Sequence, residues 1–273
     1  MSETPIQATV KETIAANLAR DIADGEVVSV GANLAVARAA ALLAHLTSGP
    51  NMTIVMGMSK ANIRHVPRIE EFKFLSDHRS GRWAEAYFRH DEFMANMRYR
   101  RNSVFFAGAL QVDPFGNSNL IGIGTDPSRL RFRGPGPIGT CNGAAMFDRF
   151  HLVLNAHDRR IFVPECDFVS AFGWRRGETT REDLALPGGG PRFVVTPLCI
   201  MDFETPDRRM RLRSVHAGVS MEQVRDATGF DLAMPGDVPT TPPPTTGELA
   251  ILRERIDPSG SLRVAADTDP RRD

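Results

Sequence analysis

The first 56 residues alternate between a helical and a strand-like hydrophobic period. Apolar side chains recur every four positions over 10–23, which predicts a helix with one apolar stripe. The runs 27–30 (VVSV) and 52–56 (MTIVM) are short, apolar and rich in β-branched side chains, so each indicates a buried strand. An alanine-rich helix that ends near Thr47 is expected between them. This order predicts a parallel sheet with right-handed crossovers.

The rest of the chain adds strands and turns more than helices. A helical stripe is expected over 84–97 and a long apolar strand over 103–112. Glycine is too dense over 122–139 for a helix to run through it. The segments 192–203 and 210–216 predict strands joined by a hairpin-length connection of turn residues. The pattern therefore predicts an α/β protein with antiparallel hairpin additions.

Length and composition limit the class of protein. The chain has 273 residues, of which 42% are hydrophobic, and this excludes a disordered polyelectrolyte. We expect a single domain over 1–256 and a disordered polar tail over 257–273. The 33 basic residues balance the 33 acidic ones, which excludes a globally basic partner of nucleic acid or of a membrane surface.

The sequence carries no sign of a membrane span, a secretory signal or a metal site. No apolar run approaches the roughly 18 residues that a bilayer requires, so a cytoplasmic protein with no membrane partner is expected. Cys141, Cys166 and Cys199 stand far apart and lack zinc-site spacing. They predict buried thiols in a reducing compartment, with no disulfide and no bound metal.

Two strand ends are candidates for a ligand site. Gly31 follows the strand 27–30 and precedes a helix, an arrangement that points backbone N–H groups at an anion or thioester oxygen. Tight packing is the alternative reason for this single glycine. The apolar strand beginning at 103 delivers Gly108, Gln111, Asp113 and Asn117 at its carboxyl end, where open α/β sheets bind ligands. A strand followed by an Asp-Pro turn would give the same pattern.

A third candidate is the alternation of Arg129, Arg131 and Arg133. Alternate arginines on a strand leave one face basic, and this face would clamp an anion such as a phosphorylated cofactor. A solvated edge strand is the alternative interpretation. The residues alone thus indicate an α/β protein with an anion or cofactor site.

Several segments, in order and over about residues 10–260, resemble the β subunit of the family I CoA-transferases, specifically that of glutaconate CoA-transferase. The segments that carry the resemblance are 25–31 (GEVVSVG), 66–68 (VPR), 106–117 (FAGALQVDPFGN), 131–134 (RFRG), 168–174 (FVSAFGW), 186–188 (LPG) and 224–230 (VRDATGF). The string 108–113 (GALQVD) equally resembles the β subunit of steroid-ring-opening CoA-thioester hydrolases.

The resemblance implies a fold and a partner. The fold is an open, largely parallel sheet with helices on both faces, of the CoA-transferase/NagB-like kind. The partner is an alpha subunit of similar fold, in an α2β2 heterotetramer with the active site between the two chains. The substrate is a coenzyme A thioester, and no cofactor is bound.

The resemblance also implies a glutamate nucleophile at the end of the second strand, where this chain has Met56. A thioether cannot form the acyl anhydride, so hydrolysis, ring opening or decarboxylation of a CoA thioester is favoured. CoA transfer with a relocated nucleophile and a non-catalytic binding subunit are the alternatives. Met56 therefore marks the position of the family glutamate without being a nucleophile itself.

The chain would then supply backbone donors and pocket walls. Gly108 and Ala109 are expected to stabilise negative charge on the thioester oxygen, together with Gly31. The other expected substrate- or CoA-binding residues are Asn33, Gln111, Asp113, Asn117, Gly134 and Gly136.

Overall fold

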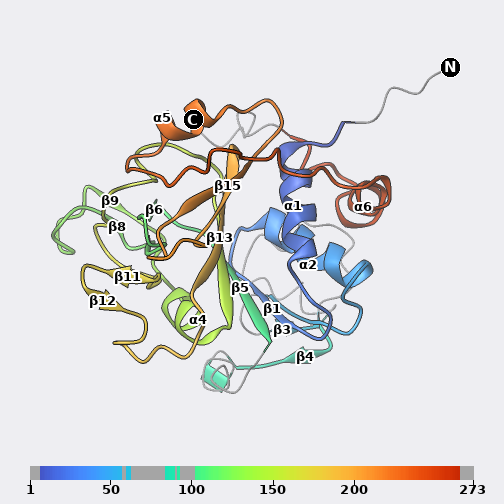
Figure 1. Ribbon diagram of the computed structural model, residues 1–273. Helices are drawn as coiled ribbons and strands as arrows, with labels where there is room; N and C mark the ends of the chain where they lie inside the picture. Colours follow the sequence, from blue (N-terminus) through green and yellow to red (C-terminus); the bar gives the residue numbers. More distant parts are fainter. Residues whose placement is uncertain (1–6, 57–59, 63–83, 90, 93–101, 265–273) are drawn as a thin grey trace.

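The computed structural model describes residues 7–56, 60–62, 84–89, 91–92 and 102–264. Its centre is a nine-stranded sheet with the order β15-β14-β13-β10-β5-β1-β2-β3-β4 (Figure 1). Five adjacent central strands are parallel: β13 (Pro191–Val195), β10 (Arg149–Val153), β5 (Ser103–Ala107), β1 (Val27–Val30) and β2 (Thr53–Met56). The predicted open, largely parallel α/β sheet is thus confirmed.

Antiparallel strands extend the sheet at both edges. On one side are β14 (Cys199–Asp202) and β15 (Arg211–Val215), and on the other are β3 (Lys60–Ala61) and β4 (Ala86–Tyr87). Three small hairpins lie outside the sheet: β6 (Gln111–Val112) with β7 (Ser118–Asn119), β8 (Gly122–Ile123) with β9 (Phe132–Arg133), and β11 (Arg175–Arg176) with β12 (Thr179–Thr180). The expected hairpin additions are therefore present.

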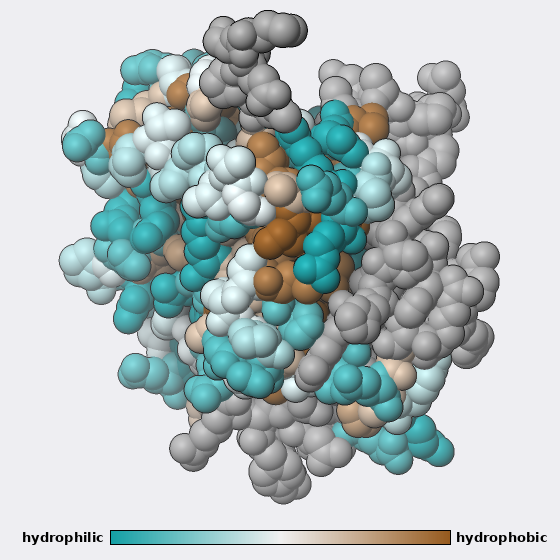
Figure 2. Space-filling model, turned by 90° about the vertical axis from the view of Figure 1, so that its right-hand side faces the viewer, coloured by the Kyte–Doolittle hydropathy of each residue, from teal (hydrophilic) through white to brown (hydrophobic). Residues whose placement is uncertain are grey.

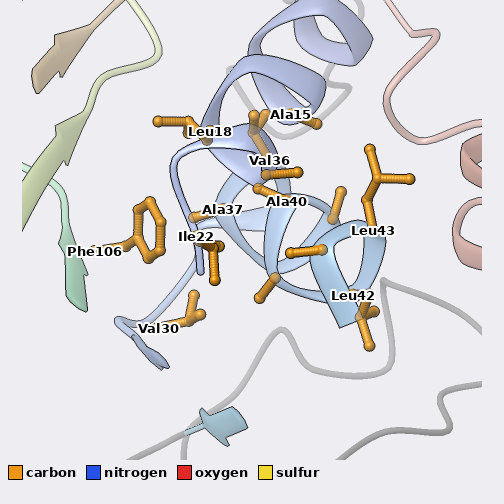
Figure 3. Packing of buried hydrophobic residues seen from close by; sticks show 14 of the residues in the cluster. Ala15, Leu18, Ile22, Val30, Val36, Ala37, Ala40, Leu42, Leu43 and Phe106 are labelled. Atoms are coloured by element: carbon orange, nitrogen blue, oxygen red, sulfur yellow. The ribbon is translucent and has the colours of Figure 1, made fainter. Parts of the chain in front are cut away.

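Helices cover both faces because successive strand residues point in opposite directions. In β5, Val104 and Phe106 join the core cluster of α1 (Val10–Arg20) and α2 (Ala35–Leu46) (Figure 3). Phe105 and Ala107 join a second cluster on the opposite face, where α4 (Thr140–Met146) packs. The two faces therefore bury two separate cores against one layer of strands.

The close pairing of α1 and α2 follows from their small side chains. Ala15 of α1 and Ala37 and Ala40 of α2 are fully buried, so the two helices approach closely beside Phe106 (Figure 3). Thr9 begins α1 with a capping box, in which its hydroxyl accepts from the Glu12 N–H and its own N–H donates to Glu12.

The C-terminal part of the chain returns to this helical layer. The remaining helices are α5 (Met221–Ala227), α6 (Thr246–Ile251) and the π-helical turn η4 (Leu252–Ile256). Arg253 donates to both carboxylate oxygens of Glu12 at 2.7 and 2.9 Å. Figure 2 shows a strip of apolar surface bordered by polar residues on this side of the molecule. No helix in the described ranges is long and apolar enough to cross a bilayer.

Four local expectations differ from the structure. The strand predicted over 103–112 ends at Ala107. The chain then leaves the sheet, and Gln111–Val112 forms the first strand of the separate β6–β7 hairpin. The strand predicted over 192–203 is two antiparallel strands that reverse at 196–198. Within the helix predicted over 84–97, Ala86–Tyr87 is a strand and 91–92 is helical, whereas 90 and 93–97 lie outside the described residues.

The fourth difference concerns the expected polar tail, which does not begin at residue 257. Asp257 is buried and accepts hydrogen bonds from the N–H groups of Ser261 and Leu262, and the Leu262 side chain is 2% exposed. Thr9 donates to the Leu262 carbonyl oxygen, which ties this segment to the start of α1. Residues 265–273 lie outside the described part.

Candidate active site

The strand order reverses at β1, which defines a topological switch point, hereafter called the crevice, at the carboxyl ends of β1 and β5. The chain passes from β1 to β2 on one side, and later to β5 on the other side of β1. The segments that leave β1 and β5 therefore diverge, and open α/β sheets bind their ligands at such a point. Residues 31–34 follow β1 here, and residues 108–110 follow β5.

Gly31 is used to join the two strands. Its N–H donates to the Phe106 carbonyl oxygen at 3.0 Å, so it is not available to a thioester oxygen as expected. A Cβ on Gly31 would lie 2.9 Å from that carbonyl oxygen and 3.4 Å from the Leu34 side chain. The glycine is thus explained by close packing, which was the alternative interpretation of the sequence.

Gly108 and Ala109 have free backbone donors. Among the described residues, neither N–H has a hydrogen-bond acceptor, and both residues are partly exposed. A Cβ on Gly108 would meet only Leu34 at 3.7 Å and the Val153 carbonyl oxygen at 3.9 Å. Packing against the described residues therefore does not require a glycine at 108.

The start of α2 lies beside these donors. Leu34 is the N-cap residue of α2, and its side chain lies close to both Gly31 and Gly108. Leu34 makes no side-chain capping hydrogen bond and the first turn contains no acidic residue, so, among the described residues, the first-turn N–H groups and the positive end of the helix dipole lack a counterpart. Asn33 precedes this cap in the left-handed region, at φ 55°, and is exposed. The crevice therefore favours a negatively charged ligand atom.

Met56 ends β2, next to β1. It is paired with Val30 and is 4% exposed, and its side chain belongs to the core cluster of α1 and α2. The side chains of residues 31–34, 108 and 109 are also non-ionisable. Within the described part of the chain, residues 31–34, 56, 108 and 109 thus offer donors but no acid, base or nucleophile.

Asp113 and Asn117 form an internal turn, which differs from their expected binding role. The Asp113 carboxylate accepts from the N–H groups of Phe115 and Asn117 and from Asn117 Nδ2, the last at 2.7 Å. Asn117 also donates to the Arg175 carbonyl oxygen and accepts from the Gly173 N–H. Burial raises the pKa of Asp113 to about 6, although these hydrogen bonds act to lower it.

The side-chain oxygen of Gln111 likewise accepts hydrogen bonds from other residues of the chain. Its Oε1 accepts from Asn119 Nδ2 at 2.7 Å and from the Asp167 N–H at 3.0 Å. Asn119 in turn accepts from the Ile121 N–H at 2.8 Å. The amide oxygen of Gln111 therefore organises the β6–β7 hairpin instead of contacting a ligand.

Gly134 and Gly136 shape the loop that leads to α4. Their N–H groups donate to the carbonyl oxygens of Ile121 and Leu120, so neither is free for a phosphate. A Cβ on Gly134 would lie 2.6 Å from the Leu110 side chain, which places this loop beside the residues that follow β5. Ile138 is 56% exposed at φ 49°, which is rare for a β-branched residue.

The hydrophobic pattern of the sequence did not identify Arg181 as a residue that holds the backbone around α4 in place. The buried guanidinium donates only to carbonyl oxygens, those of Ala144, Phe172, Gly173 and Gly188. It thereby ties the end of α4 to two loops. Burial lowers its pKa to about 10. Its position in a polar loop gave no signal of burial.

The buried thiols are not activated for chemistry. Burial raises the pKa of Cys166 and of Cys199, the latter to about 12, and thiols of this kind are unreactive. Cys141 is exposed in α4, which corrects the expectation that all three cysteines are buried. In the described ranges no three His, Cys, Asp or Glu side chains gather as a metal site.

Comparison with known proteins identifies the family of this chain. The coenzyme A transferase family model matches residues 11–146. The β subunit of glutaconate CoA-transferase from Acidaminococcus fermentans is 32% identical over 92% of this chain and 93% of its own length. The chain belongs to the coenzyme A transferase family. Within that family it is an enzyme subunit of the β type, and the predicted resemblance is confirmed.

One further relative and two solved structures are also similar to this chain. The cholesterol ring-cleaving hydrolase IpdB subunit of Rhodococcus jostii is 35% identical over 57% of this chain and 60% of its own length. The decarboxylase AibA/AibB superposes with a TM-score of 0.80 at 24% identity, over 94% of this chain and 98% of that one, which establishes likeness of fold alone. The glutaconate CoA-transferase structure gives 0.83 at 27% identity, over 95% and 98%.

Proposed function

We propose that this chain is the β subunit of a two-subunit enzyme that converts a CoA thioester by hydrolysis, ring opening or decarboxylation, without a glutamyl-CoA intermediate. The observation that carries the proposal is the pairing of free donors at Gly108 and Ala109 with a buried, non-nucleophilic Met56. The substrate class follows from the family, whose members act on CoA thioesters.

One electrostatic task is common to the three reactions. Attack of water on an acyl carbon, hydrolytic cleavage of a ring next to a carbonyl, and loss of CO₂ all place negative charge on a carbonyl oxygen. Two backbone N–H groups beside an uncapped helix start would stabilise that charge. In other enzymes each such donor lowers the activation barrier by roughly 3 kcal/mol. The acid, base or attacking water must be positioned by another segment or by the alpha subunit.

CoA transfer between carboxylic acids remains a second candidate. The observation that favours it is the extent of the match, since a named CoA-transferase subunit aligns over 92% of the chain whereas the ring-cleaving hydrolase subunit aligns over 57%. Transfer would require a nucleophile at a position other than Met56.

The test uses the chain assembled with its alpha subunit. The complex is incubated with glutaconyl-CoA, and borohydride is then added to reduce any enzyme-bound thioester. We expect no modified glutamate on this chain by peptide mass spectrometry. We also expect turnover without an acceptor acid: free CoA indicates hydrolysis of the thioester, whereas loss of CO₂ or addition of water with the thioester intact indicates decarboxylation or ring opening. A reduced glutamyl adduct, or CoA release that depends on an acceptor, would establish transfer instead.

A further inference from the structure

Three exposed arginines alternate along the β8–β9 hairpin. Arg131 and Arg133 flank Phe132, and Arg129 lies two residues before Arg131. The Arg131 N–H donates to the Ile123 carbonyl oxygen at 2.8 Å, and Ile123 is paired with Phe132 in the strand Phe132–Arg133. Arg129 precedes this strand in a turn, where its N–H donates to the Asp126 carbonyl oxygen. We refer to residues 129–133 as the arginine arm. Phe132 within it is 55% exposed.

The arm has positive charge without a counter-charge. Across the described ranges, none of its three arginines has a carboxylate within ion-pair distance. Other arginines of this chain do form such pairs, for example Arg149, with Glu26 and Asp21. Asp126, the nearest acid in the sequence, instead accepts from the N–H and hydroxyl of Ser128.

The backbone of the arm is held in place. A Cβ on Gly122 would lie 2.8 Å from the Leu130 side chain, which shows how closely the two strands pack. The Gly124 N–H donates to Asp167 Oδ2 at 2.7 Å, and the Gly134 N–H donates to the Ile121 carbonyl oxygen. The arginine side chains therefore extend from a preorganised backbone, which lowers the entropic cost of binding.

The arm is also continuous with the crevice. Gly134, directly after it, packs against Leu110, and Leu110 follows the free donors of Gly108 and Ala109. A long ligand whose carbonyl oxygen lies at these donors can therefore follow residues 110 and 134 to the arm.

We propose that the arginine arm binds the phosphate groups in the nucleotide portion of a CoA thioester, a proposal that rests on the function proposed above. Side chains two residues apart on an extended strand are separated by about 7 Å, so Arg131 and Arg133 reach separate phosphates. Guanidinium groups bind phosphate with paired, charge-assisted hydrogen bonds. Phe132 between them points to the opposite face of the strand, so the phosphate site consists of Arg131 and Arg133.

The experiment measures binding of free CoA and of pantetheine to the assembled complex by calorimetry. Pantetheine has the thiol end of CoA but no phosphate and no nucleotide. In the double variant Arg131→Gln/Arg133→Gln, we expect the Kd for CoA to rise tenfold or more, and its salt dependence to weaken. The Kd for pantetheine should stay within twofold. The matched control is Arg225→Gln/Arg255→Gln, which removes two exposed arginines outside the arm and should leave both values unchanged.

Each other outcome has a distinct meaning. If the wild-type complex binds neither CoA nor pantetheine, the proposed function fails, and this inference fails with it. If the wild-type complex binds CoA and the arm variant binds it equally well, only the inference fails. If the arm variant is folded by circular dichroism but no longer assembles with the alpha subunit, the arm is a protein interface and its assignment to phosphate is wrong.

Discussion

The Gly31 N–H donates to the Phe106 carbonyl oxygen, and a Cβ on Gly31 would lie 2.9 Å from that same oxygen. The glycine thus holds β1 against β5 at the point where both strands end. We expect Gly31→Ala to separate the strand ends and to lower the free energy of unfolding by about 1–3 kcal/mol. Urea denaturation followed by circular dichroism measures this change.

Gly108→Ala is the matched variant on the adjacent strand end. A Cβ there would make only ordinary contacts, at 3.7 Å with Leu34 and 3.9 Å with the Val153 carbonyl oxygen. We expect a stability change within about 0.5 kcal/mol. We also expect roughly a tenfold or greater loss of turnover in the assembled enzyme, because the methyl group lies beside the donors proposed to hold the thioester oxygen. Full turnover in this variant would place the oxyanion elsewhere.

His157 makes the stability of the chain depend on pH. Its Nδ1 is 2.9 Å from Thr196 Oγ1, and its Nε2 is 3.1 Å from Thr228 Oγ1. The Thr228 hydroxyl donates to the Val224 carbonyl oxygen, so its oxygen must accept from a proton on Nε2. Burial lowers the pKa of His157 from 6.5 to about 4, so at neutral pH the ring is uncharged and Nδ1 is an acceptor.

A lowered histidine pKa means that the unfolded chain binds the proton more readily than the folded one. The contribution of His157 to stability is therefore complete above pH 6.5 and is lost as the pH falls toward 4. We expect the free energy of unfolding to fall over this interval in the wild type, and to fall less in His157→Gln. Equal pH slopes for the two proteins would show that His157 is not the responsible group.

Arg181 should be one of the stability-determining side chains of the crevice region. It donates to four backbone carbonyl oxygens and has no carboxylate partner among the described residues. Because truncation leaves these oxygens unpaired, we expect Arg181→Met to lower the free energy of unfolding by about 2–4 kcal/mol. Arg160→Met, which removes an exposed arginine, is the control and should change stability little. A small effect of Arg181→Met would show that water replaces the guanidinium.

The parallel core of the sheet was predictable because local pattern and burial agree there. The β-branched run at 27–30 is a strand with those same ends, and the order of elements gave the parallel pairing of β1 with β2. The interruption of the strand after Ala107 was not predictable from hydrophobicity. Leu110 and Val112 continue the apolar character, but Leu110 and Gln111 pair with Asn119 and leave the sheet.

The candidate site was predictable in position but only partly in residue roles. Strand ends and glycines indicated the crevice, and Gly108 and Ala109 do have free donors there, as far as the described residues extend. Which glycine is required for packing depends on a neighbouring strand, and Phe106, which excludes a Cβ at Gly31, is 75 residues away in sequence. The role of Asp113 likewise depends on tertiary hydrogen bonds that no spacing rule contains.

Met56 permits the most direct test of the chemistry. The side chain is 4% exposed in an apolar cluster, so a carboxyl group there would be buried and its pKa raised. We expect Met56→Glu to be less stable than Met56→Gln by about 2–3 kcal/mol at pH 8, and by less at pH 5, where the carboxyl is largely neutral. In the assembled complex supplied with glutaconyl-CoA, borohydride should reduce a glutamyl-CoA thioester on Met56→Glu to the side-chain alcohol with release of CoA, an adduct expected on neither the wild type nor Met56→Gln. An adduct on the wild type would assign the nucleophile to another residue. Binding of CoA by Met56→Glu without any adduct would show that position 56 does not face the acyl carbon.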